Sequence, residues 1–132
     1  MTRRRWAAAT ALVAYGAMLL GACASPPPAP GLMDMLDRPA ERTLFEGMRA
    51  YDDGQYANAE KALRQALAHT LASPRDRATA HKLLAFIQCT SDRLQGCEAE
   101  FRAARMADPG FALNRAEAGH PTWGPVYRRV VP

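Results

Sequence analysis

Residues 41–71 read ERTLFEGMRAYDDGQYANAEKALRQALAHTL, and this stretch decides the fold. Its first half places Leu44, Gly47, Met48 and Tyr51 at positions i, i+3, i+4 and i+7, which is the spacing of one helical face. Asp52-Asp53-Gly54 predicts a turn. After the turn, a second helical stripe contains Tyr56, Ala59, Leu63, Ala66, Leu67 and Leu71. The stretch therefore predicts two helices joined in a hairpin.

A second hairpin is expected between residues 73 and 109. Ser73 is a good N-cap, Pro74 suits a first helical turn, and Asp76 stands three residues after Ser73 as in a capping box. A helix is expected at residues 77–89, RATAHKLLAFIQC. A turn is expected at residues 91–96, SDRLQG. The last long helix is expected at residues 97–109, CEAEFRAARMADP. No stretch shows sustained strand alternation. We therefore expect an all-α fold built from four helices in two antiparallel hairpins.

The first hairpin resembles a tetratricopeptide repeat. The resemblance lies in Gly47, Tyr51, Gly54, Tyr56, Ala59, Leu63 and Ala66, which fall at the spacings of that repeat. It implies that Gly47 and Ala59 are small residues where the two helices cross. The second hairpin fits the same frame 38 residues later, whereas the usual period is 34. An unrelated antiparallel helix bundle would share the pattern of small residues and is the alternative.

The N-terminus has the features of an export signal. Arg3, Arg4 and Arg5 precede an uncharged run from Trp6 to Leu20, which is short for a membrane span and suits a signal peptide. Gly21 and Ala22 directly before Cys23 resemble the bacterial lipobox, which implies that Cys23 carries lipid on the mature protein. Multiple acyl chains would then give lasting membrane attachment. An ordinary secretory signal with a nearby cysteine is the alternative.

These features divide the chain into a signal peptide (1–22), a lipidated cysteine with a proline-rich tether (23–37) and one small helical domain (38–132). The tether contains Pro26, Pro27, Pro28 and Pro30, which favour extended chain. The whole chain has 17 basic and 13 acidic residues, but removal of residues 1–22 leaves 14 and 13, a formal charge of +1. The mature chain therefore gives no support to nucleic-acid binding, which needs a basic patch.

Cys89 and Cys97 flank the turn of the second hairpin. In the repeat frame they lie on facing helices near the connecting turn, and an exported protein is in an oxidising compartment. This setting favours a disulfide. Free buried thiols, a metal site and a catalytic cysteine are the alternatives. They are weaker because zinc usually needs four ligands and a nucleophile needs a base, while only His81 lies nearby in the sequence.

The C-terminal segment reads ALNRAEAGHPTWGPVYRRVVP, residues 112–132. One short helix is expected at about residues 114–118, followed by irregular backbone, because Gly119, Pro121, Gly124 and Pro125 oppose a long helix. Such a segment favours a cap over the open end of the last hairpin. The alternative is a docking segment in which Trp123 and Tyr127 anchor a partner.

Three runs together resemble the TssQ-type lipoproteins associated with type VI secretion systems. These runs are AHKLLAFIQC, EAEFRAARMADPGFAL after the second cysteine, and AEAGHPTWGPVYR. The resemblance implies a tetratricopeptide-like periplasmic domain with an accessory role beside the secretion apparatus, and it supplies no catalytic residue. Ala24 stands where an aspartate would favour inner-membrane retention in bacterial lipoproteins, so we expect the periplasmic face of the outer membrane.

The expected function is that of a scaffold or adaptor that binds a periplasmic protein partner, such as a secretion-system subunit. Arg49, Asp53 and Lys82 are candidate groove residues on the solvent side of the helices, together with Trp123 and Tyr127 in the docking alternative. An envelope assembly factor or pilotin-like lipoprotein for outer-membrane proteins or pili is the second hypothesis. No common enzyme motif is present, and we expect no catalytic residue, metal or cofactor.

Overall fold

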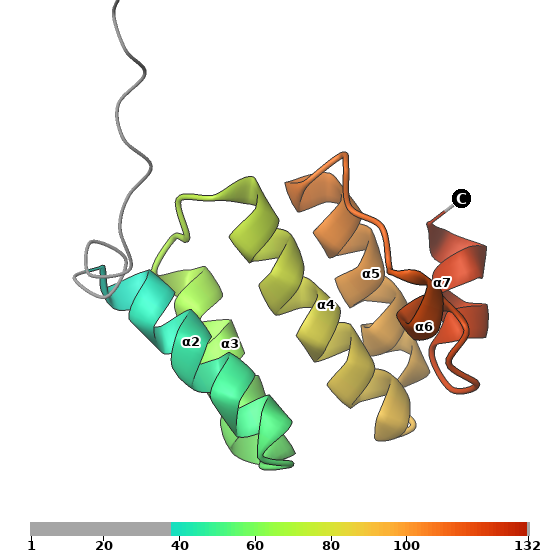
Figure 1. Cartoon of the computed structure of the whole chain (residues 1–132), viewed down its shortest axis with the longest axis horizontal. Coiled ribbons are helices and arrows are strands. Elements are labelled where there is room, and N and C mark those ends of the chain that lie inside the picture. The colour runs from blue at the N-terminus through green and yellow to red at the C-terminus, as the bar shows by residue number, and fades with distance from the viewer. Residues whose placement is uncertain (1–37, 132) are drawn as a thin grey trace, which may run out of the picture.

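The computed structural model describes residues 38–131, and these form six helices with no strand among them (Figure 1). The all-α fold class is thereby confirmed. The helices are α2 (Pro39–Asp52), α3 (Tyr56–Ala68), α4 (Pro74–Thr90), α5 (Leu94–Ala107), α6 (Arg115–Ala118) and α7 (Gly124–Val130). Cys23 and the rest of residues 1–37 lie outside the described residues, so the signal peptide, lipidation and tether stay predictions.

The first hairpin consists of α2 packed against α3, and its crossing point is at Gly47. A Cβ added to Gly47 would lie 2.9 Å from Leu63 Cγ and 3.1 Å from Leu63 N. Ala59 and Leu63 have no exposed surface. The close approach of the two helices therefore depends on small residues, as the sequence predicted. Met48 and Tyr56 were expected on the packed stripes, but they are 37% and 50% exposed and lie at the edge of the interface.

Helix α4 is the central helix, with α2 and α3 on one side and α5 on the other (Figure 1). Ser73 caps it as predicted, because its hydroxyl accepts a hydrogen bond from the Asp76 N–H, and Pro74 lies in the first turn. The run from Leu83 to Cys89 is buried at every position. A helix that is buried nearly all round must be covered by other elements on most sides.

The expected turn at residues 91–96 is too long. Helix α5 begins at Leu94, so only Ser91, Asp92 and Arg93 connect the two helices. Asp92 has a φ of 58°, a left-handed conformation that aspartate tolerates better than most residues. Gly96 is helical, and a Cβ there would overlap the side-chain amide of Gln88 on α4. This glycine therefore permits close packing of two helices instead of marking a turn.

The C-terminal segment is more helical than the sequence indicated. The short helix was confirmed as α6, where Asn114 and Glu117 form a reciprocal capping box. The expectation of irregular backbone after it was wrong, because residues 124–130 form α7 and place Val126 and Tyr127 on a helix. Pro125 occupies the first turn, where a missing N–H costs no hydrogen bond. Helix α7 packs against α5 at the end of the row of helices (Figure 1).

Candidate functional site

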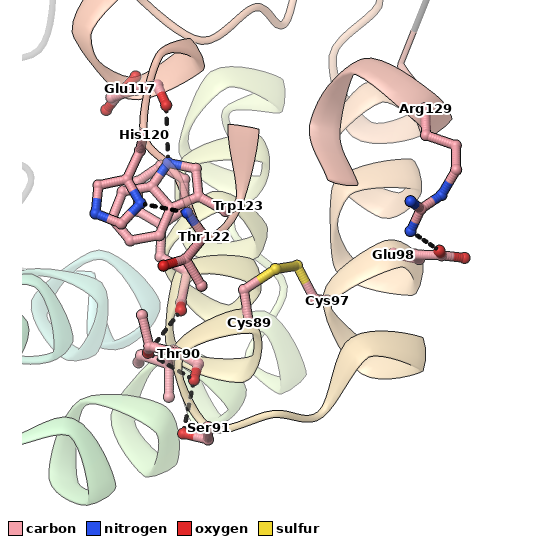
Figure 2. Close-up of a disulfide and its surroundings, with 12 residues drawn as sticks. Cys89, Thr90, Ser91, Cys97, Glu98, Glu117, His120, Thr122, Trp123 and Arg129 are labelled. Carbon is pink, nitrogen blue, oxygen red and sulfur yellow. Dashed lines mark hydrogen bonds and ion pairs between the residues drawn. A yellow bond between two sulfur atoms is a disulfide. The ribbon is translucent and has the colours of Figure 1, made fainter. Parts of the chain in front are cut away.

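Cys89 on α4 and Cys97 on α5 form a disulfide, as predicted (Figure 2). Their Cα atoms are 5.1 Å apart, and the two residues are 3% and 0% exposed. The bond crosses the hairpin near its connecting turn, where antiparallel helices are close enough for this separation. With both sulfur atoms bonded to each other and buried, neither cysteine is a nucleophile or a metal ligand in this state.

A chain of charged side chains joins the two hairpins on the side of α3 and α5. Glu60 on α3 accepts hydrogen bonds from Arg93, the residue before α5, at 2.7 and 3.0 Å, and from Arg64 at 2.9 Å. Arg64 also reaches Glu100 on α5 at 3.4 Å. The hydrogen bond from Arg93, followed by that from Arg64, lowers the pKa of Glu60 from 4.5 to about 2. The network links α3 to α5 by side chains alone, because the two helices do not pack directly against each other.

His81 belongs to this network and is not placed for catalysis by a cysteine. Its Nδ1 lies 2.6 Å from Glu100 Oε2, and both side chains are largely buried. Gln88 Nε2 also approaches Glu100, at 3.5 Å. A histidine next to a carboxylate is half of a general-base arrangement, but the cysteine that the sequence offered as nucleophile is tied in the disulfide. The contact links α4 to α5.

Trp123 lies within a stack of three rings instead of standing free. Its ring centroid is 4.2 Å from that of Phe86 and 3.4 Å from that of His120, with interplanar angles of 18° and 3°. Its indole N–H donates to the Glu117 carbonyl at 2.9 Å (Figure 2). Phe86 is only 4% exposed. The loop between α6 and α7 therefore covers Phe86 on α4.

Tyr127 completes the cap over α5. Its ring packs edge-on against Phe101 and Phe111, with centroids 5.4 and 6.2 Å away. Its hydroxyl accepts a hydrogen bond from the Leu113 N–H at 3.2 Å. Both aromatic residues offered as docking anchors are thus used in packing the C-terminal segment onto the hairpin, which favours the capping interpretation.

The two basic candidates differ in their surroundings. Lys82 on α4 is partly buried, donates to Glu117 Oε1 at 2.6 Å and lies 5.8 Å from the centre of the Phe86 ring. This lysine therefore fixes α6 to α4, which the sequence did not suggest. Arg49 on α2 and Asp53, the residue after this helix, are exposed. A role of these residues in partner binding stays a prediction.

A pocket of about 260 Å³ lies where α4 meets the segment before α6. Its lining contains Arg75, Thr79 and Lys82 from successive turns of α4, with Asp108 and Phe111 opposite. Lys82, which lines the pocket, also donates to Glu117. The pocket is small and carries charges of both signs, so it suits a side chain of a bound segment better than a large ligand.

One exposed surface was missed at the level of sequence. Arg42, Phe45 and Arg49 share one face of α2, and Arg38 stands four residues before Arg42 at the start of the helix. Phe45 is 55% exposed. The spacing of 4, 3 and 4 residues between these positions is a helical period and could have been read from the sequence. We call these four residues the α2 stripe.

No group of three or more histidine, cysteine, aspartate or glutamate side chains within residues 38–131 is arranged to hold a metal ion. None of the described helices has both the length and the hydropathy of a membrane span. The chain matches no family model, and no curated protein or solved structure shows significant similarity to it. The functional argument therefore depends on the residues themselves.

Proposed function

We propose that this chain is a membrane-anchored periplasmic scaffold or adaptor lipoprotein that acts by protein–protein interaction, as an accessory component of a type VI secretion system. The lipid on Cys23 attaches it to the periplasmic face of the outer membrane, and the proline-rich residues 24–36 act as a tether. The helical domain then meets its partner at a distance from the bilayer of up to roughly 40 Å, at ~3.1 Å for each tether residue.

The disulfide is the single observation that carries this proposal. Disulfides form and persist in oxidising compartments and are rare in the bacterial cytosol. The buried bond between Cys89 and Cys97 therefore agrees with export directed by the N-terminal signal. The third cysteine, Cys23, is then left for lipid attachment, which accounts for all three cysteines of the chain.

The helical architecture supports a binding role. Stacked helix pairs, as in a tetratricopeptide array, present an extended surface that can bind a partner. Such an array also needs a cap over the apolar face of its last helix pair, and the C-terminal segment covers that face here. We place the partner on the exposed face of α2 that carries Arg49 and at the pocket beside Lys82 on α4. The proposal assigns no catalytic residue.

The test combines fractionation with crosslinking in cells. We expect the wild-type protein in the outer-membrane fraction with a lipid-modified N-terminus at Cys23, and a Cys23→Ser variant to lose both. A photocrosslinker at position 49 should capture secretion-system subunits, whereas one at position 106, where the native Met106 is 84% exposed, serves as the control. Recovery of β-barrel or pilus subunits from position 49 would favour the assembly-factor alternative. A soluble, unmodified wild-type protein would refute the proposal.

A further inference from the structure

We propose that the pocket beside Lys82 recognises the carboxylate of a glutamate side chain on the protein partner, through Arg75 and Thr79 of α4. This inference rests on the proposed function, in which the partner occupies this pocket, and it names the chemical group that the pocket selects. It also predicts that the pocket accepts a single carboxylate and rejects phosphate.

Two hydrogen-bond donors that line the pocket are not used by the fold. Arg75 and Thr79 lie four residues apart on α4, so their side chains project from the same face of the helix on successive turns. Within residues 38–131, neither side chain makes a hydrogen bond or an ion pair. The other threonines of the described helices, Thr43 and Thr90, donate to carbonyl oxygens one turn earlier. The hydroxyl of Thr79 and the guanidinium of Arg75 are therefore available to a ligand.

The chemistry of these donors favours a carboxylate. An arginine guanidinium presents a planar fork of N–H groups that can bind both oxygens of a carboxylate, and it stays charged at physiological pH. A hydroxyl one turn along the helix can donate to one of the same oxygens. Arg75 is exposed and free to move onto a group that enters the pocket, whereas Thr79 is half-buried and positioned by the helix.

The apolar wall of the pocket favours a glutamate side chain as the source of the carboxylate. Ala78 and Phe111 line the pocket and are 2% and 8% exposed. The two methylene groups of glutamate can pack on this wall while its oxygens reach the two donors. A carboxylate at a chain terminus has no such apolar stem between its oxygens and the backbone. A volume of about 260 Å³ is enough for one side chain.

The acids around the pocket set its selectivity. Asp108 lines the pocket, and its Oδ1 accepts a hydrogen bond from the Gly110 N–H at 2.8 Å. The charge of Lys82 is met by Glu117 at 2.6 Å. Because these two acids balance Arg75 and Lys82, recognition depends on directed hydrogen bonds and not on an excess of positive charge. The second negative charge of a phosphate would face Asp108 with no further cation to offset it.

Blocked peptides test the pocket on the purified mature chain, residues 23–132, with the disulfide formed. The probe is acetyl-Ala-Glu-Ala-amide, and the readout is the change in backbone amide NMR signals within residues 75–82 and 108–112. Acetyl-Ala-Gln-Ala-amide has nearly the same shape without the charge. Acetyl-Ala-Ala-Ala with a free carboxyl end supplies the same chemical group from a chain terminus.

We expect saturable shifts with the glutamate peptide and at least tenfold weaker binding of the glutamine peptide, because a hydrogen bond to a charged group contributes about a factor of ten or more. Arg75→Gln should weaken binding of the glutamate peptide at least tenfold, and Thr79→Val about threefold. Arg115→Gln, at an exposed arginine of α6 that is not part of the pocket lining, should leave binding unchanged.

Asp108→Asn tests the selectivity. Asparagine keeps the side-chain oxygen that accepts a hydrogen bond from Gly110, so the loop is retained, but the opposing charge is removed. Binding of the glutamate peptide should tighten at least twofold. Inorganic phosphate should leave the wild-type signals in place and shift those of this variant. No shifts with the glutamate peptide, equal binding of the two blocked peptides, or tighter binding of the free chain terminus would overturn the inference.

The peptide experiment needs only the purified chain, so its result does not depend on the lipid anchor or on the identity of the partner. Failure of the glutamate peptide to bind would refute the chemistry assigned to the pocket and leave the capture of secretion-system subunits from position 49 intact. Absence of that capture would count against the proposed function, whatever the peptides show.

Discussion

At the scale of single residues, Gly47 is the position where one methyl group decides how closely two helices pack. An added Cβ would lie 2.9–3.1 Å from atoms of Leu63, which has no exposed surface. Overpacking of this kind costs about 1–3 kcal/mol, against a gain of up to about 1 kcal/mol in helix propensity. We therefore expect Gly47→Ala to lower the free energy of unfolding by about 1 kcal/mol, measured by urea titration.

A double-mutant cycle separates the steric effect from the propensity effect. In a Leu63→Ala background the two close side-chain carbons are gone and only the backbone N remains at 3.1 Å, so Gly47→Ala should be clearly less destabilising. If Gly47→Ala destabilised both backgrounds equally, the contact with Leu63 would not be the reason that glycine is needed.

Glu60 is the residue whose ionisation should affect stability most clearly. Its pKa in the folded chain is about 2, below the ordinary 4.5, because Arg93 and then Arg64 hydrogen-bond to the carboxylate. A lowered pKa means that its contribution is complete above about pH 4.5 and is lost as the pH falls towards 2. We expect Glu60→Gln to destabilise by about 1 kcal/mol at pH 7, near the upper end for exposed ion pairs.

The measurement is the free energy of unfolding of both proteins from pH 7 down to pH 2. The difference between wild type and Glu60→Gln should shrink below about pH 4.5. Glu46→Gln, at an exposed position on α2, is the control and should show a smaller difference. A gap that stayed constant with pH would contradict the assigned role of the two arginines.

At the scale of elements, the disulfide is the main constraint on the α4–α5 hairpin. It closes a loop across a sequence separation of 8, for which the chain-entropy model gives about 2–3 kcal/mol. We expect the double variant Cys89→Ala/Cys97→Ala to lose about this much stability in urea titration. Reductant should destabilise the wild type by a similar amount and leave the double variant unchanged.

Several element boundaries could be predicted from sequence, and others could not. Ser73 and Pro74 mark the start of α4 because their effects on the backbone are local. Gly96 was expected in a turn and Gly124 was expected to oppose a long helix, but in the structure each is also a site of close packing. A Cβ at Gly124 would lie 2.5 Å from the Ala118 carbonyl oxygen, and one at Gly96 would meet Gln88. The sequence alone does not distinguish a glycine needed for a turn from one needed for contact with a distant residue.

At the scale of the whole molecule, the C-terminal segment closes the row of helices, and Trp123 is its main contact with α4. Its ring stack on Phe86 and its hydrogen bond to Glu117 should both be lost on truncation. We expect Trp123→Ala to destabilise by about 3–4 kcal/mol, as for other large-to-small aromatic substitutions. Thermal unfolding followed by circular dichroism would measure this.

Trp123→Phe keeps an aromatic ring and should recover part of the stability. If Trp123→Ala instead left the melting temperature unchanged while abolishing partner recovery, Trp123 would be a docking residue and the capping interpretation would fail. The same comparison of melting temperature and partner recovery, made with Tyr127→Ala, tests whether Tyr127 packs or docks, since its ring contacts Phe101 and Phe111.

The sequence by itself determined the all-α class, the two long hairpins and the pairing of Cys89 with Cys97, because helical periodicity, capping and the spacing around a turn are local properties. The tertiary structure alone decided that α7 exists, that Lys82 binds Glu117 and that Trp123 stacks between Phe86 and His120. The bond between Lys82 and Glu117 joins residues 35 positions apart, and the packing of Trp123 on Phe86 and of α7 on α5 is also between segments distant in the sequence. No local pattern specifies which distant surface a segment will cover. For this reason Trp123 and Tyr127, which the sequence offered as docking anchors, are packing residues in the structure.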